Sequence, residues 1–199
     1  MTNTWNEWFN TVEYMFGEEP NIFIKSYAAQ LEGLKKVAAF AEGEGRNAVF
    51  LATLGHEVTA FDYAESGLRK TKRLAKKNNV EVNTVQVDLL EGTIPTQQFD
   101  AAIMVFGHFP KGKQSLVFDK IVNAVRPGGK IMMELYSEDQ LEYQTGGPKE
   151  LEMLYKPQNL LDWCEGSKIL HLFVGEQTRL EGKLHTGLAH VIQLIIEKK

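Results

Sequence analysis

The sequence predicts an α/β fold in which a doubly wound, mostly parallel seven-stranded sheet carries helices on both faces and ends in a C-terminal antiparallel hairpin. From residue 34 onward, short apolar runs alternate with helical stretches. This alternation favours right-handed crossovers between parallel strands. Near the C-terminal end, two long strand-like runs are joined by a short link, and strands joined so tightly pair antiparallel.

Each element follows from a local pattern. Apolar runs predict the first five strands over residues 36–41, 57–62, 82–88, 99–106 and 130–136. Amphipathic stretches predict helices over residues 46–54, 65–77 and 113–125, with Gly55 ending the first of them and the turn over residues 126–129 ending the third. A helix over residues 157–164 precedes the strand-like runs 169–177 and 187–197, whose link covers residues 178–186.

An aromatic N-terminal segment precedes this alternation. Its apolar residues have the i, i+3, i+4, i+7 spacing of one amphipathic helix: Trp5, Trp8, Phe9 and Val12. Pro20 suits the first turn of a second helix, whose apolar positions are Phe23, Ile24, Tyr27 and Leu31. We therefore expect a single domain over residues 1–199, with a helical cap over residues 1–33 and a core over residues 34–199.

The composition is ordinary for a globular protein and slightly acidic. Hydrophobic residues make up 43% and charged residues 24% of the 199 residues, and the formal net charge is −4. This charge gives no electrostatic reason to expect nucleic acid or an anionic membrane as a partner. The basic run over residues 69–77 is interpreted as the solvated face of a helix.

Cysteine usage and hydropathy indicate a cytoplasmic protein. The single cysteine, Cys164, cannot form an internal disulfide, and no Cys/His cluster has the spacing of a metal site. The N-terminus lacks the basic start of a signal peptide, and the apolar runs fall far short of the roughly 18 residues that a membrane-spanning helix needs. No pattern indicates an oligomeric state.

The turn after the first predicted strand is rich in glycine and acid. It reads Glu42-Gly43-Glu44-Gly45-Arg46-Asn47-Ala48. In open α/β sheets, ligands bind beyond the carboxyl ends of the strands. Gly43 and Gly45 let the backbone approach such a ligand, and the helix that follows offers its N–H groups to an anion.

Two further acids end the second and third predicted strands. Asp62, 17 residues after Gly45, is placed to accept hydrogen bonds from both hydroxyls of a ribose. Asp88 is placed to meet an adenine amino group, with the Leu89 backbone beside it. The sequence therefore predicts a nucleoside cofactor at this end of the sheet.

Two cofactor classes fit this pattern, and a glycine pair also occurs in turns that merely connect a strand to a helix. Gly43-x-Gly45-x-x-Ala48 matches the fingerprint of dinucleotide sites. However, Glu42 and Glu44 would repel a pyrophosphate at close range. S-adenosylmethionine instead presents an ammonium, a sulfonium and one carboxylate, so an acidic loop suits it better.

With these landmarks in order, the chain resembles the class I S-adenosylmethionine-dependent methyltransferases from about residue 34 to its C-terminal end. The aromatic N-terminal helix and Gly45-Arg46-Asn47 look closest to the small bacterial branch that includes the tellurite-resistance methyltransferases. The resemblance implies a Rossmann-like core, S-adenosylmethionine as cofactor and a small-molecule methyl acceptor that no motif identifies. It implies cofactor contacts from Glu42, Gly43, Gly45, Arg46, Asn47, Asp62, Tyr63, Asp88, Leu89 and Phe106.

The first loop departs from the pattern of that family. The family loop usually reads acid-x-Gly-x-Gly-x-Gly, whereas this chain has Ala39 at the acid position and Ala41 at the first glycine. The contact from that acid toward the amino acid end of the cofactor is therefore missing. We expect Glu42 to replace it by facing the ammonium.

Candidates for chemistry lie after the later strands. His108, directly after the fourth predicted strand, is a candidate base, with a turn histidine bonded to backbone as the alternative. Candidates for a lid or substrate contact are Tyr14, Phe16 and Gly17 at the end of the N-terminal helix, Tyr143, and His185 in the link between the last strands. Plain surface turns or core packing are the alternatives for these residues, and His56, His171 and His190 are assigned to structure.

The sequence thus favours a methyltransferase acting on a small molecule. A dinucleotide-dependent oxidoreductase remains open because the glycine spacing fits both cofactors. A cofactor-binding protein of the same fold without catalysis also remains open, because fold alone does not specify an activity.

Overall fold

A computed structural model gives the fold of this chain. It describes residues 4–182 and 185–199, with only the backbone of Thr4 and His185. In this part of the chain one seven-stranded sheet has the order β3-β2-β1-β4-β5-β7-β6. Strands β1 to β5 run parallel, whereas β7 pairs antiparallel with both β5 and β6. The predicted fold class is confirmed.

Most strands lie close to their predicted positions, but β5 begins at Val125, five residues before its predicted start, so the turn predicted over residues 126–129 lies within this strand. Their bounds are β1 Lys36–Phe40, β2 Glu57–Asp62, β3 Val82–Gln86, β4 Phe99–Val105, β5 Val125–Tyr136, β6 Lys168–Glu181 and β7 His185–Glu197. Because β1 to β5 are parallel, their carboxyl ends meet at one edge of the sheet. The order reverses direction between β1 and β4, which is the topological switch point where ligands of such sheets bind.

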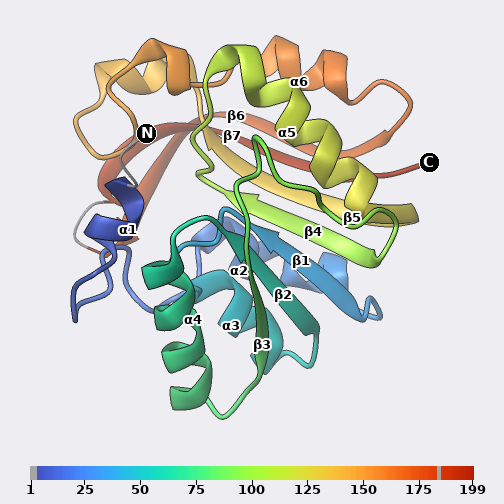
Figure 1. The fold of residues 1–199 in the computed structure, drawn as a ribbon. Coiled ribbons are helices and arrows are strands. Elements are labelled where there is room, and N and C mark those ends of the chain that lie inside the picture. Colours follow the sequence, from blue (N-terminus) through green and yellow to red (C-terminus); the bar gives the residue numbers. More distant parts are fainter. Residues whose placement is uncertain (1–3, 183–184) are drawn as a thin grey trace.

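The helices form two layers, as Figure 1 shows. Their bounds are α1 Thr4–Trp8, α2 Ile22–Tyr27, α3 Arg46–Thr53, α4 Glu65–Lys77, α5 Lys111–Ala124 and α6 Pro157–Trp163, with short 3-10 turns η1 Ala28–Leu31, η2 Glu138–Glu142 and η3 Leu151–Met153. Helices α2, α3 and α4 share one core with one face of the sheet. Helices α5 and α6 share a second core with the other face.

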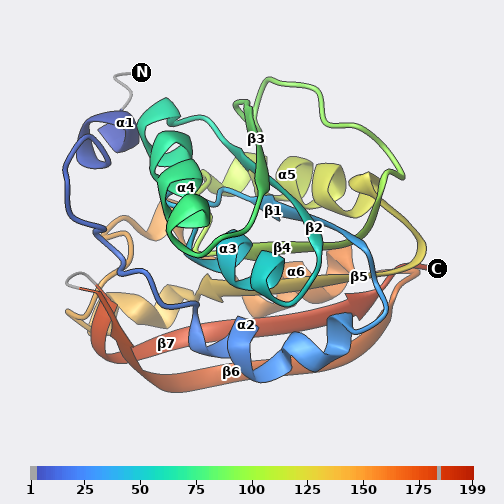
Figure 2. The ribbon, with the colours of Figure 1, turned by 90° about the horizontal axis from the view of Figure 1, so that it is seen from below.

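The expected N-terminal helix is much shorter than the apolar spacing suggested. Helix α1 ends at Trp8, and Val12 is 82% exposed. After the helix the chain runs along α4, where side chains bind its carbonyls: Arg73 Nη2 donates to Val12 O at 2.9 Å and Lys70 Nζ donates to Glu13 O at 2.5 Å. Figures 1 and 2 accordingly place α1 beside α4.

The predicted link over residues 178–186 is also wrong, because most of it is strand. The ladder of β6 and β7 continues to the pair Glu181 and His185. Its polar residues read as a loop in the sequence, but Arg179 and Glu181 are buried in ion pairs with residues of other elements. His185 therefore begins β7, and its side chain lies outside the described residues.

No helix within the described residues is long and apolar enough to cross a membrane. A group of three or more His, Cys, Asp or Glu residues able to hold a metal ion is likewise absent from the described residues.

Candidate active site

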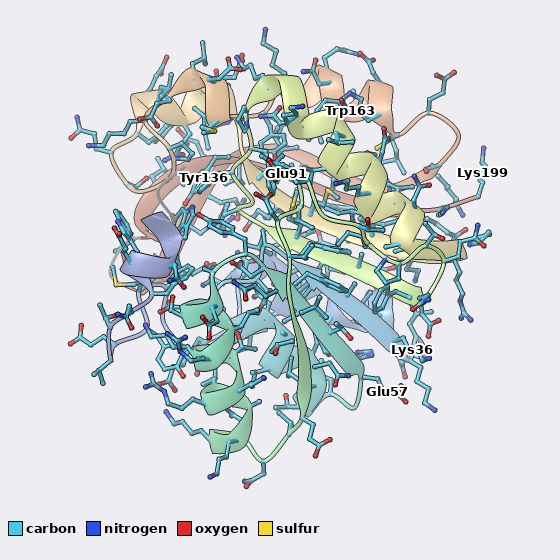
Figure 3. All side chains as sticks on the ribbon, viewed as in Figure 1. Lys36, Glu57, Glu91, Tyr136, Trp163 and Lys199 are labelled. Carbon is cyan, nitrogen blue, oxygen red and sulfur yellow. The ribbon has the colours of Figure 1, made fainter. Side chains whose placement is uncertain are left out.

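A cavity of about 570 Å³ opens at the carboxyl ends of the parallel strands. In Figure 3, Tyr136 at the end of β5 lies on this side of the molecule, whereas Lys36 and Glu57, which begin β1 and β2, lie at the opposite end of the sheet. The cavity is lined by Trp5, Phe9, Phe16, Ala41, Glu42, Gly43, Arg46, Asn47, Asp62, Tyr63, Val87, Asp88, Leu89, Leu90, Val105, Phe106, Gly107, His108, Phe109, Pro110 and Met153. Its volume falls in the range usual for small-molecule sites.

The glycine loop is fixed by contacts with two neighbouring segments. Gly43 N donates to Asp62 Oδ2 at 2.7 Å, which ties the loop to the end of β2. Gly43 has a φ of 61°, and a Cβ there would lie 3.1 Å from the Phe9 ring. Ala41 also adopts a positive φ, 49°, at the end of β1. The backbone at this turn is therefore held in a shape that favours glycine.

Glu42 lines the cavity and also caps the helix that follows it. Its Oε1 accepts hydrogen bonds from Asn47 N at 2.9 Å and Ala48 N at 2.7 Å. Burial raises the pKa of this carboxyl from 4.5 to about 7, although the two backbone donors and nearby Arg46 lower it in part. The N–H groups that the sequence analysis assigned to an incoming anion are thus already used by the protein's own carboxylate.

The two acids after β2 and β3 both line the cavity as predicted, but in different surroundings. Asp62 is buried, and its Oδ1 accepts from Ala64 N at 2.8 Å while its Oδ2 accepts from Gly43 N. Burial raises its pKa. Asp88 is exposed at the rim and accepts from Leu90 N at 2.8 Å. Each carboxylate keeps lone pairs for further donors, since an ionised carboxylate accepts about four hydrogen bonds.

Glu44 and Gly45 lie beside the cavity rather than in its lining. Glu44 is 3% exposed and pairs with Lys70 Nζ at 2.5 Å. Gly45 has a φ of 90°, and a Cβ there would lie 2.5 Å from Thr71. The structure therefore gives these two residues a packing role between α3 and α4. It also corrects the interpretation of the basic run on α4, because Lys70 is 4% exposed.

The N-terminal segment covers the cavity with aromatic rings. The Trp5 and Phe9 rings stack with centroids 5.5 Å apart, and Phe16 lies 6.2 Å from Trp5. Tyr14 does not line the cavity, because its hydroxyl donates to Lys70 O at 3.1 Å on the outer side. Gly17 likewise lies outside the lining. All three lid candidates follow α1 in irregular chain and do not end a helix.

His108 follows β4 and lines the cavity, half-buried. Its ring centroid lies 6.1 Å from Trp5 and 6.1 Å from Tyr136. Burial lowers its pKa from 6.5 to about 4, and within the described residues no charged or hydrogen-bonding neighbour offsets that effect. The alternative of a turn histidine bonded to backbone is therefore not what the described structure contains. The neutral imidazole carries one acceptor nitrogen and one donor.

Beneath His108 lies a buried charged network that no sequence pattern indicated. Arg179 and Glu134 form an ion pair with both side chains fully buried. Arg46 Nη2 pairs with Glu181 Oε2 at 2.7 Å. Asn21 Nδ2 joins the two pairs by donating to Glu134 Oε2 at 2.6 Å and to Glu181 Oε1 at 3.1 Å. This network ties the segment before α2 to α3, β5 and β6.

Phe106 lies between the cavity and the Arg179 side of this network, whereas Arg46 of the network lines the cavity itself. The Phe106 ring stacks on Tyr136 with centroids 4.2 Å apart, and the Arg179 guanidinium lies 5.9 Å from its centroid. Phe106 adopts a φ of 53°, which costs a non-glycine residue free energy and occurs most often at functional sites. The chain thus turns sharply between β4 and His108, and Phe106 and the residues that follow it all line the cavity.

Tyr143 and the turn that follows it lie away from the described cavity lining. The Tyr143 hydroxyl donates to Glu176 Oε1 at 2.7 Å, on the outer surface of β6. The turn with Gly146-Gly147-Pro148 packs on Tyr136, since a Cβ at Gly147 would lie 2.9 Å from its ring. These contacts support a packing role for the turn, and Tyr143 stays a prediction as a substrate contact.

The sequence analysis missed most of the apolar lining. The unassigned lining residues are Trp5, Phe9, Ala41, Val87, Leu90, Val105, Gly107, Phe109, Pro110 and Met153. One signal for the aromatic lining was present in the sequence. The aromatic residues Trp5, Trp8 and Phe9 lie close together near the start of the chain, in a helix too short to bury them all by itself. Met153 carried none, since its place depends on the packing of η3.

Comparisons with known proteins agree with this geometry. Residues 37–129 match the model of a family described as a methyltransferase domain. Two curated relatives from Haemophilus influenzae strains, each named as a probable S-adenosyl-L-methionine-dependent methyltransferase TehB, are 24% identical to this chain over 169 residues. The alignment covers 81% of this chain and 59% of the relative, so the chain spans about three fifths of the length of these relatives.

Solved structures share the fold over almost the whole chain. One, from work on the conversion of a disulfide bond into a thioacetal group during echinomycin biosynthesis, has a TM-score of 0.77 at 18% identity and covers 100% of this chain and 92% of its own. TehB from Haemophilus influenzae has a TM-score of 0.71 at 15% identity, over 98% of this chain and 66% of that chain. A candidate methyltransferase from Bacillus halodurans C-125 has a TM-score of 0.72 at 14% identity, over 89% of this chain and 98% of that chain. The family match over residues 37–129 is thus to a methyltransferase domain, and the solved structures show that this chain shares their fold.

Proposed function

We propose that this chain is an S-adenosylmethionine-dependent methyltransferase that transfers a methyl group to a small-molecule acceptor. The observation that carries the proposal is the chemistry of the cavity within the matched domain. Its described lining includes three carboxylates, Glu42, Asp62 and Asp88, and a single cation, Arg46, which is already paired with Glu181. A lining with this balance favours a cationic ligand and disfavours a pyrophosphate.

The residues present fit the cofactor at both of its ends. Asp62 and Asp88 have free acceptor positions for the hydroxyl and amino groups of the nucleoside. Glu42, buried beside Asp62, offers a carboxylate to the ammonium. S-adenosylmethionine supplies an activated methyl group, so the protein contributes alignment and exclusion of water. The aromatic rings of the N-terminal segment supply that exclusion.

Titration calorimetry with S-adenosylmethionine and S-adenosylhomocysteine tests the proposal. We expect micromolar binding of both, and Asp62→Ala is expected to weaken both at least tenfold because the ribose contact and the Gly43 tether are lost. Asp100→Ala is the matched control. Asp100 also accepts two backbone hydrogen bonds, from Lys35 N at 2.7 Å and Lys36 N at 2.9 Å, but at the opposite end of β1.

The outcomes separate the candidate functions. Binding of neither compound contradicts the proposal, and equal losses in Asp62→Ala and Asp100→Ala contradict the placement of the ribose. Stabilisation by NAD or NADP in a thermal shift, without any by S-adenosylmethionine, supports the oxidoreductase instead. The proposal includes a cytoplasmic setting, supported by the single buried Cys164, and no nucleic acid partner, supported by the acidic balance of the chain.

A further inference from the structure

The cavity has two chemically different sides. The carboxylates lie at the ends of β1 and β2 and after β3, which form one wing of the sheet. The other side is formed by Phe106 to Pro110 after β4, and by Trp5 and Phe16 from the N-terminal segment. Because β4 lies next to β1, this second side adjoins the cofactor side at the switch point of the sheet. An acceptor has to occupy this second side.

The second side carries aromatic rings and lacks a free charge among the described residues. Trp5, Phe106 and Phe109 line it, together with the neutral His108. Arg46 is the nearest lining cation, and its guanidinium is bound to Glu181 and to Phe16 O. An anionic methyl acceptor would therefore lose its hydration without forming an ion pair with an unpaired cationic side chain. Burying an unpaired charge in this way costs free energy of binding. A cationic acceptor would repel the cationic cofactor.

The polar side chain on this side of the cavity is His108, which can accept a hydrogen bond from a ligand. His108 keeps one unprotonated ring nitrogen at neutral pH, because burial lowers its pKa to about 4. Its side chain is half-buried at the cavity wall and, within the described part of the chain, no neighbour satisfies it. The Trp5 ring lies beside it, with the two ring centroids 6.1 Å apart. A ligand that donates a hydrogen bond satisfies this nitrogen.

We infer that the methyl acceptor is an uncharged planar molecule with an O–H, S–H or N–H group, seated against Trp5 and Phe106 with that group donating a hydrogen bond to His108. This inference rests on the proposed function. Aromatic rings favour planar ligands through stacking and burial of apolar surface. Phe106 is held in its strained turn against Tyr136, so this wall is rigid before the acceptor arrives.

The chemistry balances with these groups alone. The heteroatom of the acceptor uses a lone pair to form a bond to the methyl carbon, and the carbon–sulfur bond breaks with its electron pair left on sulfur as a neutral thioether. The proton of the heteroatom passes to His108 and then to solvent. A histidine with so low a pKa does not ionise the acceptor beforehand. It orients the donor group and takes the proton as the heteroatom becomes cationic during attack.

Ligand binding in the presence of saturating S-adenosylhomocysteine tests this inference. The probes are phenol and aniline, with toluene as the ring lacking a donor and 4-hydroxybenzoate as the charged ring. Saturation-transfer NMR and titration are expected to show binding of the donor rings, and at least tenfold weaker binding of 4-hydroxybenzoate. His108→Ala is expected to weaken phenol binding about fivefold to tenfold and to leave toluene binding unchanged. His56→Ala, a half-buried histidine bonded to Leu34 O, is the matched control.

Each outcome decides the inference. Tighter binding of 4-hydroxybenzoate than of phenol, binding of none of the neutral rings, or equal losses for phenol and toluene in His108→Ala would overturn it. Trp5→Ala provides a second variant, which is expected to weaken all neutral rings together. Failure of the rings to bind while S-adenosylhomocysteine still binds refutes the acceptor class and leaves the proposed function standing. Failure of S-adenosylhomocysteine to bind refutes the proposed function itself.

Discussion

Replacing Glu42 by glutamine is expected to stabilise the ligand-free protein at pH 8 and to weaken its binding of the cofactor. Glutamine keeps an oxygen at the place of Oε1, so the hydrogen bonds from Asn47 N and Ala48 N to this position can remain. What disappears is the cost of holding a negative charge in a buried site. The variant therefore separates the capping role of Glu42 from its charge.

The magnitude follows from the displaced pKa. Glu42 titrates at about 7 in the folded protein, against 4.5 as its ordinary value. At about 1.4 kcal/mol for each tenfold change in proton affinity, ionising it costs roughly 3 kcal/mol of stability. Because the folded-state pKa is raised, this contribution favours the fold below pH 4.5 and is lost as the pH rises through 7. Wild type is thus expected to be roughly 3 kcal/mol less stable than Glu42→Gln at pH 8, as an upper limit, and nearly equal to it at pH 4.5.

The stability of wild type has to be compared with that of Glu42→Gln at each pH, because His108 changes the stability of wild type with pH in the opposite direction to Glu42. The folded-state pKa of His108 is lowered to about 4, so its contribution is complete above pH 6.5 and is lost as the pH falls toward 4. The two effects partly cancel in the wild-type pH curve, whereas the difference between wild type and Glu42→Gln isolates the carboxylate.

Urea denaturation of both proteins between pH 4.5 and pH 8 measures this difference. Glu44→Gln is the control, because Glu44 is equally buried but paired with Lys70, so its loss is expected to destabilise the protein at pH 8. A pH-independent difference between wild type and Glu42→Gln would refute the reasoning. Calorimetry in buffers of different ionisation enthalpy adds a second test, since binding a cation beside Glu42 is expected to release protons near pH 7.

Gly45→Ala is expected to destabilise the protein by about 2 kcal/mol or more, because its Cβ would lie 2.5 Å from Thr71 in addition to the backbone strain. Gly55→Ala, with a similar positive φ but open space around its Cβ, is the control, and equal losses in urea denaturation would contradict the packing argument. Arg179→Met is expected to cost about 3–5 kcal/mol by leaving Glu134 buried and unpaired. Adding Glu134→Gln is expected to restore much of that loss, and a double variant as unstable as the single one would be the contrary result.

The sequence was most informative where local pattern and global fold agree. The bounds of β2 and α4 were predicted to the residue, because turn signals at Gly55 and a strong amphipathic pattern mark their ends. The wing of the site formed by Glu42, Asp62 and Asp88 was also predicted, since parallel strands bring their carboxyl ends together.

The errors share a different cause, namely contacts between distant segments. Arg179 reads as a loop residue in the sequence, but its partner Glu134 lies 45 residues away in β5. Beyond helix α1 the chain leaves the helical path, and its carbonyls at Val12 and Glu13 accept hydrogen bonds from residues of α4, more than fifty positions later. The hydrophobic periodicity of a segment does not depend on which distant residues it contacts. The ends of the strands and the N-terminal segment were therefore predicted least well.

The cavity lining comes partly from the matched region and partly from the N-terminal segment. The carboxylates belong to the matched region, residues 37–129, whereas Trp5, Phe9 and Phe16 precede it and are attached chiefly through side chains of α4. A short stretch held in this way can be exchanged for another without disturbing the ladder hydrogen bonds of the sheet. Under the proposed function, exchange of this stretch within a family or a library would change Trp5 and Phe16 on the acceptor side, while Phe106, His108 and the carboxylates of the matched region stay in place.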